Sequence, residues 1–189
     1  MSSASSARAW VRRLPAHMRG LAGDAWRYGW VSLPLAALWV LAAMRLFVDP
    51  TPRIPLLFNW SPSLPYHVAW LSGPAQSYAR GDYVVFRFEG EAQYAYPGLR
   101  HQPFFKIIAG VAGDAVTVRD RNVFVGGQHV GFAKLHSFDG RALEPIAQGR
   151  IPAGAYFMRG TSPDSFDSRY RASGLVGAQQ ILGRVIPLF

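Results

Sequence analysis

A continuous apolar stretch near the N-terminus constrains this chain more than any other feature. It runs for 19 residues from Trp30 to Val48, with the sequence WVSLPLAALWVLAAMRLFV. About 20 such residues cross the hydrocarbon core of a bilayer as a helix. Pro34 lies near the start, where a membrane helix tolerates proline, and Arg45 lies near the end, where its side chain can reach the interface. The stretch therefore predicts one N-terminal transmembrane helix at residues 30–48.

Basic residues gather on one side of this stretch. The formal net charge is +9, and the N-terminal cluster of arginines comprises Arg8, Arg12, Arg13, Arg19 and Arg27. Cytoplasmic flanks of membrane helices are rich in Lys and Arg. We therefore expect residues 1–29 to form a cytoplasmic basic tail and residues 49–189 to form an extracytoplasmic domain. In a bacterium this means a single-pass protein of the inner (cytoplasmic) membrane, with its C-terminal domain on the periplasmic side.

Three alternatives to this topology differ in what they require of the sequence. A cleaved secretory signal has a shorter apolar core and a small-x-small cleavage site. A buried core helix remains open, but a strongly basic flank before 19 apolar residues favours a membrane span. A nucleic-acid-binding protein would spread its basic residues along a groove. Here the cluster lies at one end of the chain, so we expect a lipid bilayer and no nucleic acid as a partner.

Residues 49–189 have the pattern of a mainly β domain. Short alternating or β-branched runs are separated by Gly, Asp and Asn turn signals, and no long amphipathic helical pattern follows residue 75. The expected strands are Tyr83–Phe88, Phe104–Ala109, Ala115–Arg119, Asn122–Val125, Tyr156–Arg159 and Ile181–Ile186. The chain contains no cysteine, which excludes thiol nucleophiles, disulfides and Cys-type zinc sites. No metal or other cofactor is expected.

Two of the possible catalytic residues stand in unusual local sequences. Ser63 lies between Pro62 and Pro65, which stiffen the backbone around its hydroxyl. Lys106 lies within the apolar run Phe104–Ala109 and shares its face with Phe104 and Ile108 if that run is a strand. Burial of that face would lower the pKa of the lysine toward neutrality. The alternative is an exposed edge-strand lysine that opposes aggregation.

Four segments, taken in order, resemble the type I signal peptidases, which use a serine/lysine dyad. The terminal box S-F-D-S-R-Y at 165–170 is followed by I-L-G-R at 181–184, and K-I-I-A-G-V-A-G-D at 106–114 resembles the lysine box. R-G-D-Y-V-V-F at 80–86 resembles the strand that precedes the lysine box in this family. The serine segment, with Asn59, Ser61, Ser63 and Pro65, resembles the TraF-type peptidases of conjugative transfer most closely. The family's usual G-D-N reads G-T-S at 160–162.

The resemblance implies a signal-peptidase-like β catalytic domain and assigns roles to six residues. Ser63 would be the nucleophile, and Lys106, as a neutral amine, would be its general base. The Ser61 hydroxyl and the Ser63 backbone N–H would bind the oxyanion. Ser165 would orient the lysine amine, while Asp167 and Arg169 would hold the terminal box in shape.

The resemblance also implies a membrane-anchored serine endopeptidase acting on a preprotein or a propilin. It would remove leader peptides from exported proteins or process a conjugative pilin. A catalytically inactive periplasmic assembly protein with the same fold is the alternative. Two further readings have less support. A self-cleaving repressor would lack the apolar span, and a Ser-His-Asp enzyme using His67 would carry a G-x-S-x-G elbow, which is missing here.

Overall fold

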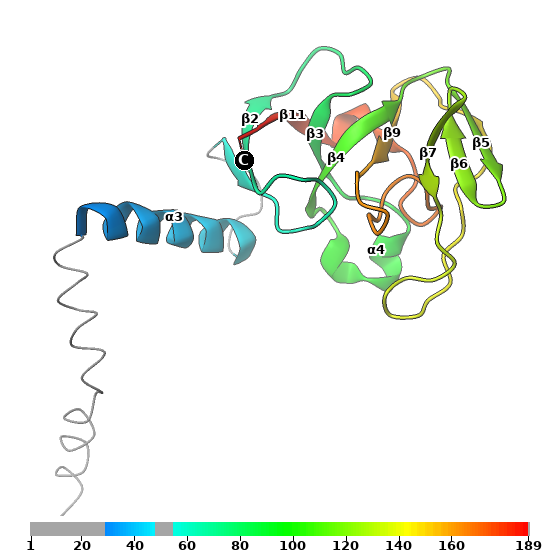
Figure 1. The fold of residues 1–189 in the computed structure, drawn as a ribbon. Helices are drawn as coiled ribbons and strands as arrows, with labels where there is room; N and C mark the ends of the chain where they lie inside the picture. The colour runs from blue at the N-terminus through cyan, green and yellow to red at the C-terminus, as the bar shows by residue number, and fades with distance from the viewer. Residues whose placement is uncertain (1–28, 48–54, 189) are drawn as a thin grey trace, which may run out of the picture. The chain divides into compact units, whose positions relative to one another are not determined.

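The computed structural model describes residues 29–47 and 55–188. The chain forms two compact units, Met1–Val48 and Asp49–Phe189. In the first unit, helix α3 spans Gly29–Phe47 and contains Pro34 (Figure 1). Its bounds agree with the helix expected at residues 30–48. In the described part of the chain, no helix is long and apolar enough to cross a membrane. The predicted transmembrane span is therefore unconfirmed, and the predicted basic tail lies almost wholly outside the described residues.

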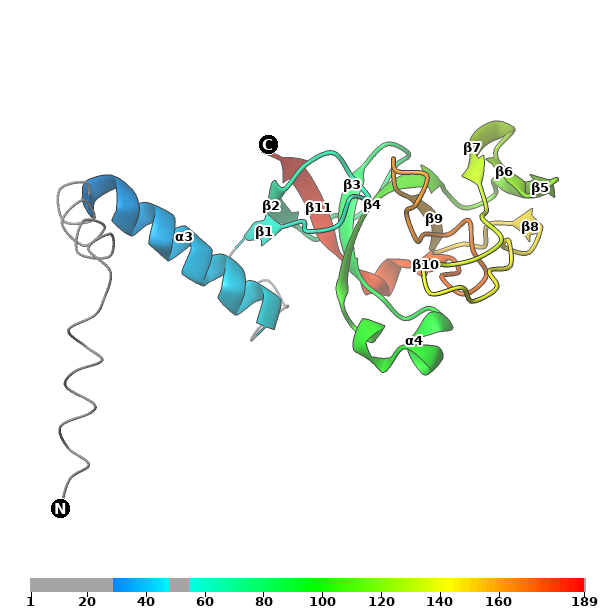
Figure 2. The same cartoon turned by 60° about the horizontal axis from the view of Figure 1, so that its bottom comes forward.

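The second unit contains two antiparallel sheets (Figures 1 and 2). The larger sheet has the order β1-β2-β11-β3-β4-β9-β10 and the smaller has the order β7-β6-β5-β8. The strands of the larger sheet are β1 (Leu56–Phe58), β2 (Val68–Gly73), β3 (Tyr83–Arg87), β4 (Pro103–Gly110), β9 (Ala155–Arg159), β10 (Val176–Gly177) and β11 (Ile181–Pro187). Those of the smaller are β5 (Ala115–Arg119), β6 (Asn122–Val125), β7 (Gln128–Phe132) and β8 (Gly149–Arg150). The prediction of a mainly β fold is confirmed.

The helical segments of this unit are short. They are α4 (Ala92–Ala95) and the 3-10 turns η1 (Pro97–Leu99) and η2 (Ala178–Gln180). All six strands expected from the sequence are present, with shifts of one residue at some ends. Strands β1, β2, β7, β8 and β10 were not expected, because short strands with exposed positions carry little periodicity.

The larger sheet is covered on both faces, which explains why its central strands read as continuous apolar runs. Val84 and Phe86 of β3 pack into one buried cluster with Ile108, while Val85 between them packs into a second cluster with Phe105. Successive side chains of a strand point to opposite faces, so the alternation follows from the pleat. A third cluster joins the smaller sheet to the edge of the larger one. The central strands β3 and β4 are therefore rigidly held.

A tight hairpin connects β5 to β6 and helps to fix a long loop. Asp120 and Arg121 form its two-residue turn, both with positive φ (46° and 65°), the pattern of a type I′ turn. The Arg121 guanidinium donates hydrogen bonds of 2.6 Å to the carbonyls of Ala133, Lys134 and Leu143. The segment 133–143, which lies between β7 and β8 and contains none of the named strands, is thus tied to the smaller sheet.

Candidate active site

The serine segment is a compact loop between β1 and β2 that Asn59 organises. The Asn59 side-chain amide donates to the carbonyl of Tyr66 at 2.9 Å, and its Oδ1 accepts from the backbone N–H (3.2 Å) and the hydroxyl (2.9 Å) of Ser61. The Asn59 backbone N–H donates to the carbonyl of His67 at 2.8 Å. These bonds close the loop around Ser63, which is only 7% exposed. The buried Asn59 (3% exposed) therefore fixes the conformation of the loop.

Buried apolar side chains hold this loop against the larger sheet. Leu64 (2% exposed) and Tyr66 (3%) belong to the same cluster as Val85 and Phe105. The Tyr66 ring meets Phe105 edge to face, with a centroid distance of 6.5 Å. Leu64 directly follows Ser63, so burial of Leu64 restricts where the Ser63 backbone can lie.

Lys106 lies in the middle of β4 and is almost completely buried. It pairs with Val84 of β3, is 3% exposed, and its Nζ lies 5.5 Å from the centroid of the Phe104 ring. Burial lowers the pKa of the Lys106 amine from its ordinary 10.5 to about 8, because desolvation disfavours the ammonium form; the Asp167 carboxylate opposes this shift and Arg169 adds to it. About a tenth of the amine is then neutral at pH 7. Such a lysine can accept a proton.

Gly160 brings the serine loop, the lysine and the terminal box together. Ile108 pairs with Met158 and Ile107 with Arg159, so one further step of this antiparallel register places Gly160 opposite Lys106. A Cβ on Gly160 would stand 2.6 Å from the Ser165 Cβ and 2.7 Å from the Ser63 carbonyl oxygen. Real contacts of this kind are longer, so only glycine fits here. Ser63 and Ser165 therefore both lie against the residue opposite Lys106.

Thr161, the next residue, is hydrogen-bonded to the backbone of the serine loop. Its N–H and its hydroxyl donate to the Ser63 carbonyl at 2.8 and 3.3 Å, and the N–H of Ser162 donates to the same oxygen at 3.4 Å. The backbone of Ser63 is thus held at the end of β9. The G-T-S sequence at 160–162, which departs from the family's usual G-D-N, supplies these donors.

The terminal box is built around a buried ion pair. Arg169 donates to the two carboxylate oxygens of Asp167 at 2.8 and 3.0 Å, and the side chains are 3% and 0% exposed. The same carboxylate accepts the N–H of Gly160 at 2.9 Å, and Arg169 also donates to the Ser165 carbonyl at 2.8 Å. The pair therefore fixes the backbone on both sides of the site.

The Ser165 hydroxyl is buried and available. Its side chain is 2% exposed, and among the described residues the hydroxyl makes no hydrogen bond. A buried hydroxyl without a partner costs about 1–3 kcal/mol. Nor does a hydrogen bond join the Ser63 hydroxyl to the Lys106 amine among the described residues. Catalytic hydrogen bonds commonly form only when substrate is bound.

The remaining candidates occupy less central positions. Ser61 is exposed, and its hydroxyl donates to Asn59, so it would have to rotate in order to bind an oxyanion. The exposed His67 directs Nδ1 toward the carbonyl of Asn59 at 3.4 Å and is not hydrogen-bonded to Ser63. Sequence reasoning assigned no role to Asn59, Gly160 or Thr161. The pattern of Asn59, Ser61, Ser63 and Pro65 was the sequence signal that marked the loop.

Together these features define a mainly β domain in which a serine loop and a Ser-x-Asp-x-Arg box meet at a buried lysine of lowered pKa. The family model described as "Signal peptidase, peptidase S26" matches residues 27–189, and the chain belongs to this family. The resemblance to type I signal peptidases seen in the sequence is confirmed.

Two relatives illustrate how the family resemblance is distributed. The chain is 32% identical over 89 residues to "Conjugal transfer protein TraF" of Agrobacterium fabrum (strain C58 / ATCC 33970), a match that covers 46% of this chain and 49% of that protein. The chain thus spans about half the length of the curated relative it matches. A signal peptidase I from Enterococcus faecalis V583 aligns over 59% of this chain and 98% of that one, at 22% identity and a TM-score of 0.37.

Proposed function

We propose that this protein is a serine endopeptidase that forms an acyl-enzyme on Ser63 with Lys106 as general base. The observation that carries the proposal is the buried lysine of lowered pKa opposite Gly160, the residue that contacts both Ser63 and Ser165. A serine hydroxyl needs a base within reach, and a lysine serves only as its neutral amine.

In the proposed reaction the Ser63 hydroxyl oxygen attacks the scissile carbonyl carbon while the Lys106 amine takes the hydroxyl proton. The oxyanion accepts hydrogen bonds from the Ser63 N–H and, after rotation, from the Ser61 hydroxyl. The C–N bond then breaks, and the lysine ammonium returns the proton to the leaving amine. Water, deprotonated by Lys106, hydrolyses the ester and regenerates Ser63. The Ser165 hydroxyl, which has no hydrogen-bond partner among the described residues, would hydrogen-bond the lysine amine during the reaction and orient it.

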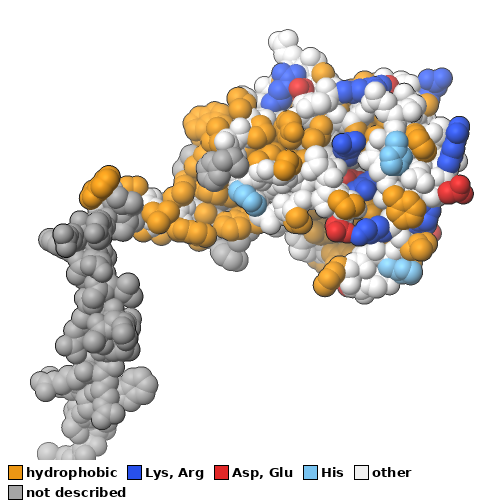
Figure 3. Space-filling model, in the orientation of Figure 1, with side chains coloured by type: hydrophobic (Ala, Val, Ile, Leu, Met, Phe, Trp, Pro, Cys, Tyr) orange, Lys and Arg blue, Asp and Glu red, His pale blue; other side chains and the backbone are white. Residues whose placement is uncertain are grey.

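The proposed substrates are exported proteins that carry leader peptides, or a pilin precursor of a conjugation system. The second possibility draws on the similarity to the Agrobacterium conjugal transfer protein. We also propose that the protein is held in the bacterial inner membrane with the catalytic unit on the periplasmic side. Hydrophobic side chains cover much of α3 (Figure 3), where Trp30, Leu33 and Trp39 are 80%, 72% and 60% exposed. Exposed apolar surface of this extent is typical of a segment in contact with lipid.

Active-site labelling tests the chemistry. An electrophilic serine probe, followed by mass mapping, should modify Ser63 in the wild-type protein and modify neither Ser63→Ala nor Lys106→Ala. A folded wild-type protein without labelling would support the alternative, an inactive periplasmic assembly protein. Carbonate extraction of cell membranes and reporter fusions at residue 25 and after residue 189 test the location. Release by carbonate, or both reporters in one compartment, would contradict the proposed topology.

A further inference from the structure

A hollow of about 960 Å³ opens in the catalytic unit, and no residue of the serine loop lines it. One wall is the segment from Glu91 to Leu99, which includes α4 and η1, and another is the loop from Lys134 to Leu143. Its floor consists of four residues of β4 and the terminal box region, namely Phe104, Phe166, Tyr170 and Ala172. This volume lies at the upper end of the range of about 300–1,000 Å³ for ligand sites.

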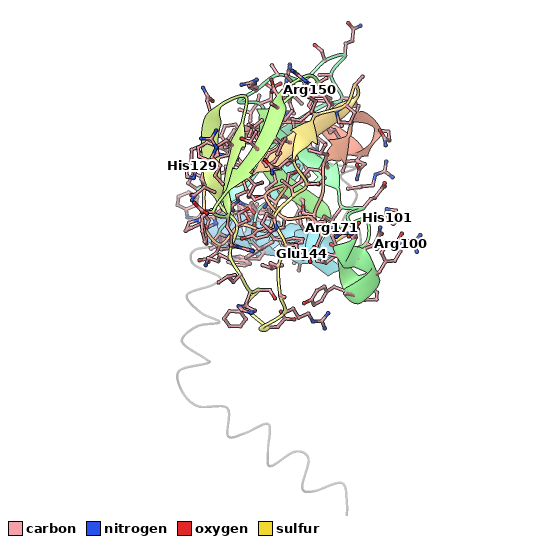
Figure 4. The ribbon with its side chains drawn as sticks, turned by 90° about the vertical axis from the view of Figure 1, so that its right-hand side faces the viewer. Arg100, His101, His129, Glu144, Arg150 and Arg171 are labelled. Carbon is pink, nitrogen blue, oxygen red and sulfur yellow. The ribbon has the colours of Figure 1, made fainter. Side chains whose placement is uncertain are left out.

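The lining of this hollow is apolar and leaves no unpaired formal charge. Its rings include Tyr96, Phe104, Phe138, Phe166 and Tyr170. Lys134 pairs with Asp164 across the hollow's edge, and Arg141 pairs with Asp139 at 3.3 Å. The Glu91 carboxylate lies 3.8 Å from the Arg171 guanidinium. Arg171 also donates a hydrogen bond of 3.2 Å to Glu144, and Figure 4 shows Arg171 and Glu144 side by side. With each charged side chain already paired, the hollow favours an uncharged, apolar ligand.

Both walls of the hollow are held in place. The three hydrogen bonds from Arg121 fix the carbonyls of Ala133, Lys134 and Leu143. The Tyr96 hydroxyl donates to Asp139 at 2.5 Å and so joins the two walls across 43 residues of sequence. Phe138, at 111% relative exposure, stands at the rim with its ring in solvent. A preformed cavity with a free aromatic ring at its mouth suits a ligand that brings apolar side chains.

The hollow lies close to the catalytic centre at two points. Lys134 also lines a smaller hollow of about 260 Å³, whose walls include Gly160 and Thr161. Thr161 is hydrogen-bonded to the Ser63 carbonyl, so one wall of the smaller hollow contacts the serine loop. On the floor, the Phe104 ring lies 5.5 Å from the Lys106 Nζ. The larger hollow therefore adjoins the segments that surround Ser63 and Lys106, where a polypeptide substrate would be bound.

We propose that the larger hollow is an exosite that binds an uncharged, apolar segment of the polypeptide substrate, remote from the scissile bond. The proposal rests on the proposed peptidase function, because it assigns the ligand as substrate. It adds a second point of recognition outside the residues that react. Apolar side chains bound there raise kcat/KM by holding the chain across Ser63.

A binding experiment tests the hollow independently of catalysis. The full-length Ser63→Ala chain is titrated with two synthetic peptides, acetyl-Gly-Phe-Leu-Phe-Gly-amide and acetyl-Gly-Ser-Ser-Ser-Gly-amide. Only the first should bind. Ala95→Trp in the same background fills the hollow from an exposed position on α4 and should weaken binding about tenfold or more. The matched control is Tyr94→Trp, which places an indole on the same helix at a residue outside the lining and should leave binding unchanged.

A cleavage experiment then ties the hollow to substrate. A sequence that the wild-type enzyme cleaves in a peptide library is extended with Phe-Leu-Phe or Ser-Ser-Ser. The apolar extension should raise kcat/KM about tenfold in the wild type and in Tyr94→Trp, and not in Ala95→Trp. Equal peptide affinity in Ala95→Trp and in the unmodified background would overturn the exosite. So would a dimer that Ala95→Trp dissociates, because the hollow would then bind a second copy of the chain. If the serine probe does not label the protein, the proposed peptidase function is wrong. The peptide titration then still shows whether the hollow binds apolar peptides.

Discussion

Thr161 donates two hydrogen bonds, from its backbone N–H and from its hydroxyl, to the carbonyl oxygen of Ser63. Ninety-eight residues separate the two in the chain. The backbone of Ser63, the proposed nucleophile, is thus fixed by the segment that follows β9, the strand adjacent to the one that carries Lys106. The relative position of serine and lysine is set by this junction as much as by either local sequence.

Removing the Thr161 hydroxyl should loosen the junction without unfolding the protein. One net hydrogen bond is worth about 1 kcal/mol, so Thr161→Val should lower kcat about fivefold while KM changes little. Thr161→Ser keeps the hydroxyl and should restore most of the rate. A Thr161→Val enzyme with normal kcat would show that the backbone donors suffice to hold Ser63.

The serine loop offers a graded pair of substitutions. Ser63→Ala removes the proposed nucleophile and should abolish processing of a precursor while the protein stays folded. Ser61→Ala removes one proposed oxyanion donor and should slow processing by about 100- to 1,000-fold. Because the Ser61 hydroxyl now bonds Asn59, a much smaller loss would mean that it keeps this bond throughout the reaction. Gel assays of precursor cleavage, with circular dichroism as a folding control, distinguish these results.

The pH dependence of the rate should report the Lys106 amine. With its pKa lowered to about 8, the neutral form increases through that pH, and kcat/KM should rise and level off above it. Lys106→Arg retains a positive charge that cannot be lost, so it should be as inactive as Lys106→Ala. Lys134→Arg, at the other lysine of the chain, keeps the positive charge that pairs with Asp164, so this matched control should be near normal. An active Lys106→Arg enzyme would reopen the reading in which His67 is the base.

The lowered pKa of Lys106 also predicts that replacing this lysine with an apolar residue stabilises the fold at neutral pH. The pKa of Lys106 is lower in the folded chain than in the unfolded one, so the unfolded state binds more protons between pH 8 and 10.5 and stability rises with pH there. Below pH 8 the folded protein bears the full cost of burying the charge, about 3 kcal/mol. Lys106→Met should therefore be more stable than the wild type at pH 7, and this advantage should shrink toward pH 10. Urea unfolding at both pH values measures it.

Breaking the buried ion pair should be more harmful than replacing it. Asp167→Asn leaves the Arg169 guanidinium buried without a carboxylate, which should cost about 3–5 kcal/mol of folding free energy. The double variant Asp167→Asn with Arg169→Met removes both charges and should recover part of that loss. If the single and double variants were equally unstable, the carboxylate's bond to the Gly160 N–H would be its main contribution.

How much of this protein the sequence determines can be seen at particular residues. The strand pattern follows from alternation and turn residues, since β-branched runs bounded by Gly and Asp form strands in almost any context. The Ser63, Lys106 and terminal-box segments were likewise identified from the sequence, because their residue types and order resemble those of a known family. Strands β1 and β2, on either side of the serine loop, were not expected, because their short runs carry no strong period.

Only the tertiary structure decided how those segments meet. Whether Lys106 is an exposed edge residue or a buried lysine of lowered pKa depended on the packing of both faces of β4, which involves strands remote in sequence. The need for glycine at position 160 arises because Ser63 and Ser165 crowd it from two other segments. The roles of Asn59 and Thr161 likewise rest on hydrogen bonds across loops. Residue types and local periods are written in the sequence, but the pKa of a buried lysine and the register of a serine loop depend on long-range contacts, which form only in the folded chain.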